Sequence, residues 1–233
     1  MKLIFIRHAE PDYENNTLTE KGFKEADYLG QYYKDYTFDE IYVSPLNRAK
    51  YTLDGILKYN KKIDKNKIHC YDWLQEFLYT WDQLPNYFEN DDLFFDRNHF
   101  LEQEKLNNSA IKDRYIKATN GLDNILKEHG YERNGRVYKV NSANEKTLLF
   151  VCHLGLNNVL LSHLINIPYL ILCQSFFLAP SSVTILQSEE REKGIAAFRI
   201  HRYGDVNHLL VKNEPISKSG SFCEMYINDK ERH

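Results

Sequence analysis

Four side chains that can bind or attack a phosphate follow predicted strands at widely separated points of the chain. Arg7 and His8 end the apolar run "KLIFI", Arg48 lies in "VSPLNRAKYT", and His153 ends "KTLLFVCH". Arginine offers a planar set of N–H donors that matches phosphate oxygens, and a neutral imidazole can attack phosphorus through one nitrogen. Each residue alone has an ordinary explanation, such as a surface charge or a hydrogen-bonded core histidine. Together they predict a site that recognises and transfers a phosphoryl group.

The predicted elements that position these side chains alternate between strand and helix. The runs "KLIFI", "EIYVSP" and "KTLLFVCH" predict strands, and the segments that follow each of them have the apolar spacing or the start signals of helices. In open α/β sheets, ligands bind beyond the carboxyl ends of parallel strands. We therefore expect the two arginines and the two histidines to meet at one edge of a sheet.

Two local signals predict where helices begin in the first part of the chain. Thr19 precedes "EKGFKEADYLGQYYKDY" and is the expected N-cap of an amphipathic helix. Ser44 and Pro45 are expected as the N-cap and the first residue of the helix that carries Arg48. The N-terminus of that helix would add backbone N–H groups and a partial positive charge beside a bound phosphate.

The remaining elements complete one domain over residues 1–233. "SSVTILQ" and "IAAFRIHRY" predict a hairpin that adds antiparallel strands to the sheet. We expect an α/β fold, a three-layer sandwich with a mixed, mainly parallel sheet flanked by helices. Residues 77–145 interrupt the alternation and lack a strand pattern, so they are expected to form an inserted helical and aromatic cap. The polar stretch from Lys212 is expected to be a loop or a loosely packed tail.

Aromatic side chains of the expected cap are candidates to contact the non-phosphate part of a substrate and to exclude water. These are Trp81, Tyr87, Phe94 and Phe95. For most of them, packing in the cap's own small core is the expected role. The acidic residues Glu89, Asp91 and Asp92 are expected on a solvated face, and they would disfavour highly anionic substrates if they faced the pocket.

Composition excludes several classes of partner. The chain has 233 residues, 42% of them hydrophobic, and a net charge of −3. Because it carries no general basic field, we expect neither nucleic acid nor a membrane as a partner, and no apolar run is long enough for a signal peptide or a membrane span. The four widely spaced cysteines favour the cytoplasm over a disulfide-bonded or zinc-binding protein. The sequence leaves open whether the protein forms a homodimer.

The ordered set of motifs resembles the histidine phosphatase superfamily, which is also called phosphoglycerate-mutase-like. The motifs are "RHAE" after the first strand, "LTEKG", "VSPLNRAKYT", the acidic residue in "LQEF", and "VCHLG" after the third strand. The resemblance covers residues 1–76 and 146–211 and leaves the insertion largely unaligned. It implies a phosphoryl-transfer enzyme on an α/β fold.

The resemblance also implies a role for each site residue. His8 would be the nucleophile and would become phosphorylated. Arg7, Arg48 and His153 would hold the phosphoryl oxygens and stabilise the transition state. Glu76 would protonate the leaving alcohol and then activate water.

Other acidic residues could fill the role of proton donor that the resemblance gives to Glu76. A carboxylic acid donates a proton near neutral pH only where its surroundings raise its pKa, and the aromatic residues around Glu76 could do so. Glu76 could equally be a surface charge. Asp72 and Glu10 are the competing proton donors, and Glu76 is preferred over either of them.

The chain departs from the family pattern at two glycines. Ala9 follows the nucleophile, and Leu154 follows the second histidine, with Gly155 one place later. Leu154 could narrow the pocket, which would change the substrate rather than the reaction. The short "AEPDYENNTLTEKG" lacks the extended segment typical of glycolytic mutases and favours a phosphatase.

The leading expectation is a cofactor-independent phosphatase of the histidine acid type, which hydrolyses a small-molecule phosphomonoester through a phosphohistidine on His8. A phosphomutase that uses the same residues and a non-catalytic phospho-ligand-binding protein are the alternatives. A metal-dependent hydrolase is disfavoured, because His8, Glu10 and Asp12 stand without a partner motif. We therefore expect no metal site.

Overall fold

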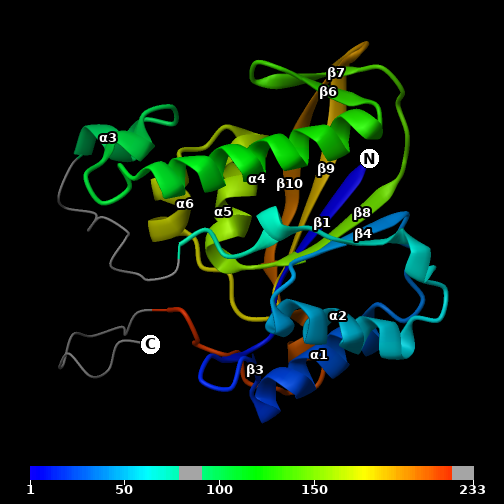
Figure 1. Ribbon diagram of the computed structural model, residues 1–233. Coiled ribbons are helices and arrows are strands. Elements are labelled where there is room, and N and C mark those ends of the chain that lie inside the picture. The colour runs from blue at the N-terminus through cyan, green and yellow to red at the C-terminus, as the bar shows by residue number, and fades with distance from the viewer. Residues whose placement is uncertain (79–90, 222–233) are drawn as a thin grey trace.

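An eight-stranded mixed sheet forms the frame of the protein, and the computed structural model describes it within residues 1–78 and 91–221 (Figure 1). The strand order is β5-β4-β8-β1-β9-β10-β7-β6. The half from β5 to β1 is parallel, whereas the half from β9 to β6 is antiparallel. In chain order the strands of this sheet are β1 (Lys2–Arg7), β4 (Glu40–Val43), β5 (Ile68–Cys70), β6 (Tyr131–Asn134), β7 (Val137–Val140), β8 (Thr147–Cys152), β9 (Val183–Glu192) and β10 (Ile195–Asp205).

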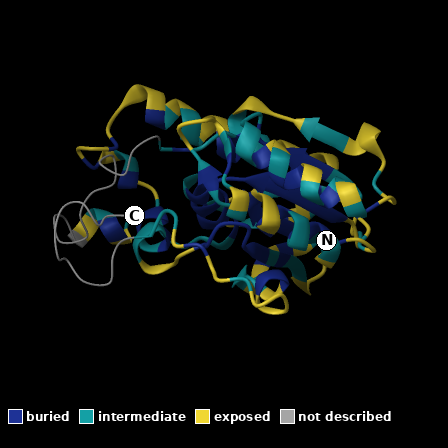
Figure 2. Ribbon diagram, turned by 90° about the horizontal axis from the view of Figure 1, so that it is seen from below, coloured by how far each residue is buried: buried dark blue, intermediate teal, exposed yellow. Residues whose placement is uncertain are grey.

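Helices cover both faces of the sheet, so the expected three-layer α/β sandwich is confirmed. One layer holds α1 (Glu20–Tyr32), α2 (Asn47–Tyr59) and α7 (Asn207–Leu210), and the other holds α4 (Ser109–Glu128), α5 (Leu154–Ile165) and α6 (Tyr169–Ser175) (Figure 1). Alternate residues of β1 serve the two layers, because side chains of a strand point alternately to opposite faces. Leu3 and Phe5 belong to the core under α4 and α5, and Ile4 and Ile6 to the core under α1 and α2. Figure 2 shows the strands buried between these layers.

The two predicted helix starts have different outcomes. Thr19 is the N-cap of α1 and its side chain accepts a hydrogen bond from Gly22 N, as expected. The prediction for the next helix was wrong, because α2 begins at Asn47 and its N-cap, Leu46, makes no side-chain cap bond. Ser44 lies before the helix; its hydroxyl lies 2.7 Å from His153 Nε2 and also accepts a hydrogen bond from Leu46 N at 3.3 Å.

The segment expected to be a cap contains more regular structure than the sequence suggested. It holds α3 (Asp91–Phe95), the 3-10 turn η4 (Phe100–Glu102), α4, and then the hairpin β6–β7, which joins the main sheet through β10. The expectation that residues 77–145 lack strands was therefore wrong. The missed signal is Asn134-Gly135, a dipeptide typical of tight hairpin turns, with Gly135 at φ +61°. Tyr138 and Phe198 then pack edge-to-face across the sheet.

The cap aromatics divide between core and surface. Phe94 is buried, Phe95 is 71% exposed, and the acidic Asp92 is exposed as expected. Trp81, Tyr87 and Glu89, as well as the side chain of Asp91, lie outside the described residues. The short elements that remain are the two-stranded pair β2 (Pro11–Asp12) and β3 (Thr17–Leu18), and the 3-10 turns η1 (Lys65–Lys67) and η2 (Asp72–Leu74).

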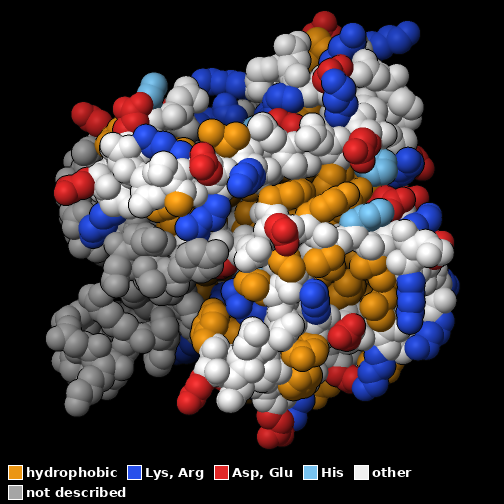
Figure 3. All heavy atoms as spheres, in the orientation of Figure 1, with side chains coloured by type: hydrophobic (Ala, Val, Ile, Leu, Met, Phe, Trp, Pro, Cys, Tyr) orange, Lys and Arg blue, Asp and Glu red, His pale blue; other side chains and the backbone are white. Residues whose placement is uncertain are grey.

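The surface carries charges of both signs. Figure 3 shows lysine and arginine interspersed with aspartate and glutamate, together with a band of apolar side chains between α4 and α2. Tyr71, which stacks on Trp73 at 6.1 Å, is 38% exposed. No helix in the described part of the chain is long and apolar enough to cross a membrane.

Candidate active site

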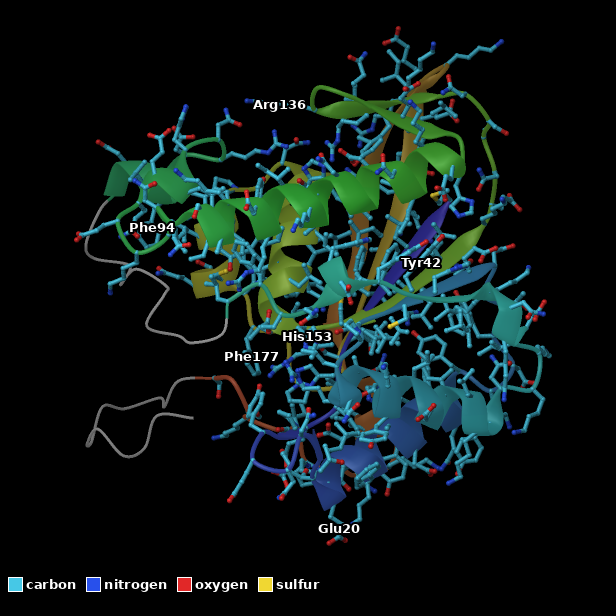
Figure 4. The ribbon with its side chains drawn as sticks, viewed as in Figure 1. Glu20, Tyr42, Phe94, Arg136, His153 and Phe177 are labelled. Atoms are coloured by element: carbon cyan, nitrogen blue, oxygen red, sulfur yellow. The ribbon has the colours of Figure 1, made fainter. Side chains whose placement is uncertain are left out.

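The pairing of β1 with β8 brings the two histidines together. Arg7 and Cys152 are partners in the parallel register, so the residues that follow them, His8 and His153, leave the sheet side by side. Their ring centroids lie 5.1 Å apart. Figure 4 shows His153 at the end of the sheet, between the layer of α4 and α5 and the layer of α1 and α2. Arg48 reaches the same edge from the first turn of α2, which follows β4.

His8 is held so that one ring nitrogen keeps a free lone pair. Its Nδ1 lies 2.8 Å from the carbonyl oxygen of Ala9. Because a carbonyl can only accept, Nδ1 carries the proton and Nε2 is the unprotonated nitrogen. Burial lowers the pKa of His8 well below its usual value, and the charges of Arg7 and Arg48 lower it further. His8 is therefore a neutral imidazole, which is the nucleophilic form.

His153 is buried beside it and is oriented by Ser44. Its Nε2 shares a hydrogen bond of 2.7 Å with the Ser44 hydroxyl, and its Nδ1 has no partner among the described residues. Burial also lowers the pKa of His153 well below the usual value, helped by His8 and Arg48. His153 is the N-cap of α5, where the helix dipole favours a bound anion. Sequence reasoning missed Ser44 because it assigned that residue to a helix cap.

The two arginines lie at the same edge with different contacts. Arg7 is 2% exposed, and its Nη1 donates a hydrogen bond of 2.7 Å to the carbonyl oxygen of Leu178. The Arg48 guanidinium lies 5.4 Å from the centre of the Tyr13 ring, and Tyr13 also interacts with Arg7. Burial lowers the pKa of Arg7; an arginine nevertheless stays cationic in proteins. Tyr13 had no signal in the sequence, since it lies in a polar loop.

Glu76 lies within the electrostatic field of both arginines. Its Oε1 accepts hydrogen bonds from Phe77 N at 2.8 Å and from Leu156 N at 3.0 Å. Burial raises the pKa of this carboxyl, whereas the two hydrogen bonds and the charges of Arg48 and Arg7 oppose the rise. A carboxyl with a raised pKa is suited to donate a proton.

The competing proton donors are placed less favourably. Asp72 lines the same cavity as Glu76 but is exposed at the start of η2. The Oε1 of Glu10 accepts a hydrogen bond of 2.8 Å from the Thr19 hydroxyl, and the Glu10 backbone N–H donates to Glu25 Oε2 at 2.8 Å. A Cβ at Gly22 would lie 2.1 Å from the carbonyl oxygen of Glu10. The motif "LTEKG" thus anchors the loop after His8.

The glycine in "VCHLG" has a structural reason. A Cβ at Gly155 would lie 2.7 Å from Oε1 of Glu76, so only glycine lets the helix approach the carboxylate this closely. Leu154 is 7% exposed and belongs to the apolar core under α4 and α5. A cavity of about 280 Å³ adjoins Glu76, and Trp73, Arg114 and Lys117 are among its lining residues. Of the candidate site residues, Glu76 is the one that lines this cavity.

The arrangement is suited to hold a dianion and to transfer its phosphorus. It combines two guanidinium groups, two neutral imidazoles, the N-terminal ends of α2 and α5, and a carboxyl with a raised pKa. Within residues 1–78 and 91–221, no group of three or more histidine, cysteine, aspartate or glutamate side chains could hold a metal ion.

Comparison with solved structures gives several phosphatases of the same fold. A mutant phosphoserine phosphatase from Entamoeba histolytica, in complex with phosphoserine, aligns with a TM-score of 0.61 and 20% identity over 89% of this chain and 98% of its own. A putative alpha-ribazole-5'-P phosphatase from Escherichia coli gives 0.58 and 16% identity over 88% and 98%. A mycobacterial glucosyl-3-phosphoglycerate phosphatase with VO3 gives 0.56 and 15% identity over 87% and 98%. At these identities the likeness shows the fold alone.

Comparison with curated proteins found no match. Comparison with family models did: the model of the histidine phosphatase superfamily (branch 1) matches residues 3–201. The matched range contains the strand ends and helix starts that carry His8, Arg48, Glu76 and His153. Since it also spans most of the chain, the protein belongs to the histidine phosphatase superfamily.

Proposed function

We propose that the protein is a phosphatase that hydrolyses the phosphomonoester of a small molecule through a phosphohistidine on His8. The observation that carries the proposal is the state of His8: a buried, neutral imidazole whose Nδ1 is bound to Ala9 O, which leaves the Nε2 lone pair available. The charges of Arg7 and Arg48 both act on this imidazole. The reaction needs no cofactor, and we assign the protein to the cytoplasm.

The first half of the reaction forms the phosphoenzyme. The Nε2 lone pair of His8 forms a bond to phosphorus while the bond from phosphorus to the ester oxygen breaks. Glu76, in its protonated form, gives its proton to the leaving oxygen, so the product departs as an alcohol. The Nδ1 proton of His8 stays on its bond to Ala9 O, which stabilises the positive charge that develops on the ring.

The second half returns the enzyme to its starting state. Glu76, now a carboxylate, takes a proton from water, and the water oxygen forms a bond to phosphorus as the bond to Nε2 breaks. Inorganic phosphate leaves, and His8 and Glu76 regain their first forms. Transfer to a second alcohol in place of water would make the protein a mutase, which the same residues permit.

The charges on the phosphoryl oxygens are neutralised by the remaining residues. Arg7 and Arg48 donate from their guanidinium groups. We assign the Ser44 hydroxyl as the donor to His153 Nε2, which puts the proton of the neutral ring on the unpartnered Nδ1, where it can be donated to a phosphoryl oxygen. Such preorganised donors stabilise the transition state more than the substrate.

The proposal is tested by phosphate release from an activated aryl phosphate, with and without a chelator. We expect the wild type to be active and chelator-insensitive, and His8→Ala to lose activity by a factor of about 10⁴ or more while keeping its melting temperature. Acid-labile phosphate trapped on the wild type and absent from His8→Ala would identify the intermediate. Activity that survives in a folded His8→Ala would overturn the assignment of the nucleophile.

A further inference from the structure

The chain beyond α7 lies against the phosphate site, and we call residues 212–221 the C-terminal strap. The family model ends at residue 201, so the strap lies outside it. It is fastened to α1, because Lys21 Nζ pairs with Glu214 at 2.9 Å and also donates to the carbonyl oxygen of Pro215. Ser217 is 3% exposed. The strap has no helix or strand, as expected for a loop, and half of its residues are exposed, but these contacts hold it at Lys21 and Ser217. It is drawn in orange to red in Figure 1.

A tight turn at the end of the strap points its backbone at the site. Ser219 N donates to the Ser217 hydroxyl at 3.2 Å, and Ser221 N donates to Lys218 O at 2.9 Å. Gly220 in this turn has φ +83°, a conformation that favours glycine. Hydrogen bonds within residues 217–221 therefore stabilise this turn, in addition to the contacts that Glu214 and Pro215 make with Lys21.

Gly220 packs directly on the guanidinium group of Arg7. A Cβ at Gly220 would lie 2.9 Å from Arg7 Nη2, 3.4 Å from Nη1 and 3.5 Å from Cζ. Arg7 has little room to yield, because it is 2% exposed and its Nη1 is bound to Leu178 O. The guanidinium is therefore confined between the Leu178 carbonyl and the strap.

We propose that Gly220 is a positioning residue for the phosphate site: the strap fixes the orientation of the Arg7 guanidinium, and only glycine at 220 allows the approach. A planar donor group binds two phosphate oxygens only in one orientation, so its confinement before binding reduces the entropy lost on binding. The consequence for catalysis rests on the proposed function, whereas the consequence for phosphate binding does not.

The test compares two glycines with the same φ. Gly194, in the turn between β9 and β10, also has φ +83°, but a Cβ there would meet nothing within 4 Å. Gly194→Ala therefore places an alanine at the same positive φ as Gly220→Ala without the contact to Arg7. We measure the affinity for inorganic phosphate by calorimetry, which does not depend on turnover. Gly220→Ala is expected to bind phosphate at least about tenfold more weakly, and Gly194→Ala as the wild type does.

A second variant tests the strap without adding a Cβ. Glu214→Gln removes the ion pair with Lys21 that fastens the strap, and its phosphate affinity is expected to lie between those of Gly194→Ala and Gly220→Ala. Equal phosphate affinities in Gly220→Ala and Gly194→Ala would overturn the inference. A wild type that binds phosphate but hydrolyses no phosphomonoester would overturn the proposed function alone, and the affinities of the variants would still decide the role of the strap.

Discussion

The two sides of the candidate site are built differently. On the phosphate side, His8, His153 and Arg7 are all 2% exposed or less, and each is hydrogen-bonded to a backbone carbonyl or a hydroxyl. On the leaving-group side, Glu76 is only partly buried and the adjoining cavity includes the exposed Lys117. In the proposed reaction, three of the four phosphate-side groups are thus held by packing at the strand ends, with Arg48 half-buried, whereas the alcohol would meet segments nearer the surface.

The two sides should respond differently to substitution. A change on the phosphate side alters groups that every phosphomonoester must meet, so its effect should be the same for all substrates. A change on the leaving-group side acts through the alcohol, so its effect should depend on how good a leaving group that alcohol is. The ratio of kcat/KM between an alkyl and an aryl phosphate therefore distinguishes a change on the phosphate side from one on the leaving-group side.

Glu76→Gln should give the largest effect that depends on the leaving group. Glutamine keeps the acceptor for Phe77 N and Leu156 N but cannot donate a proton to an alkoxide. We expect kcat/KM to fall by about 10² to 10³ for an alkyl phosphate, and far less for a nitrophenyl phosphate, whose phenolate leaves without protonation. Equal losses on both substrates would mean that Glu76 is not the proton donor.

The pH profile checks the same residue independently. Burial raises the pKa of Glu76 above its usual 4.5, so its protonated form persists to higher pH than that of an exposed glutamate. Burial lowers the pKa of His8 well below 6.5, so the neutral nucleophile persists to lower pH. The kcat/KM for an alkyl phosphate should therefore decline as pH rises through a value above 4.5, and this decline should be absent in Glu76→Gln.

Ser44→Ala should cause a smaller loss that is equal for all substrates. It removes the hydroxyl that orients His153, so His153 can turn or change its tautomer while Arg7 and Arg48 remain. We expect kcat to fall about tenfold for alkyl and aryl phosphates alike. Ser182→Ala is the matched control, because Ser182 is 1% exposed and its hydroxyl makes no hydrogen bond in the described part of the chain. A loss in Ser44→Ala no greater than in Ser182→Ala would refute the positioning role.

The sequence predicted the side of the site that depends on local patterns. Strand ends and helix spacing were sufficient to place His8, Arg48 and His153 at one edge, because buried strands and amphipathic helices have a strong period. Contacts between side chains or backbone groups of distant segments leave no periodic pattern in the sequence. The Ser44 hydroxyl facing His153 and the backbone of Gly220 against Arg7 depend on how strands and loops meet in space, so the sequence left them out.

Glu25 sits beneath the phosphate side and should have the smallest effect on activity but a clear one on stability. It is fully buried in α1, its Oε2 accepts from Glu10 N, and its Oε1 has no partner among the described residues. Burial raises its pKa from 4.5 to about 7; the hydrogen bond from Glu10 N and the charges of Lys21 and Arg7 oppose the rise, and the charge of the Glu10 carboxylate adds to it. The folded protein thus binds a proton here that the unfolded chain releases above about pH 4.5.

This raised pKa fixes the sign of the pH dependence. Between about pH 4.5 and 7 the folded state holds more protons than the unfolded state, so stability falls as pH rises, by about 3 kcal/mol in all. Glu25→Gln removes this dependence. Its free energy of unfolding in urea should exceed that of the wild type at pH 8 and approach it at pH 5. Glu20→Gln, at an exposed position of the same helix, should show no such divergence. If Glu25→Gln differs from the wild type equally at both pH values, Glu25 keeps one protonation state over this range, and the raised pKa is refuted.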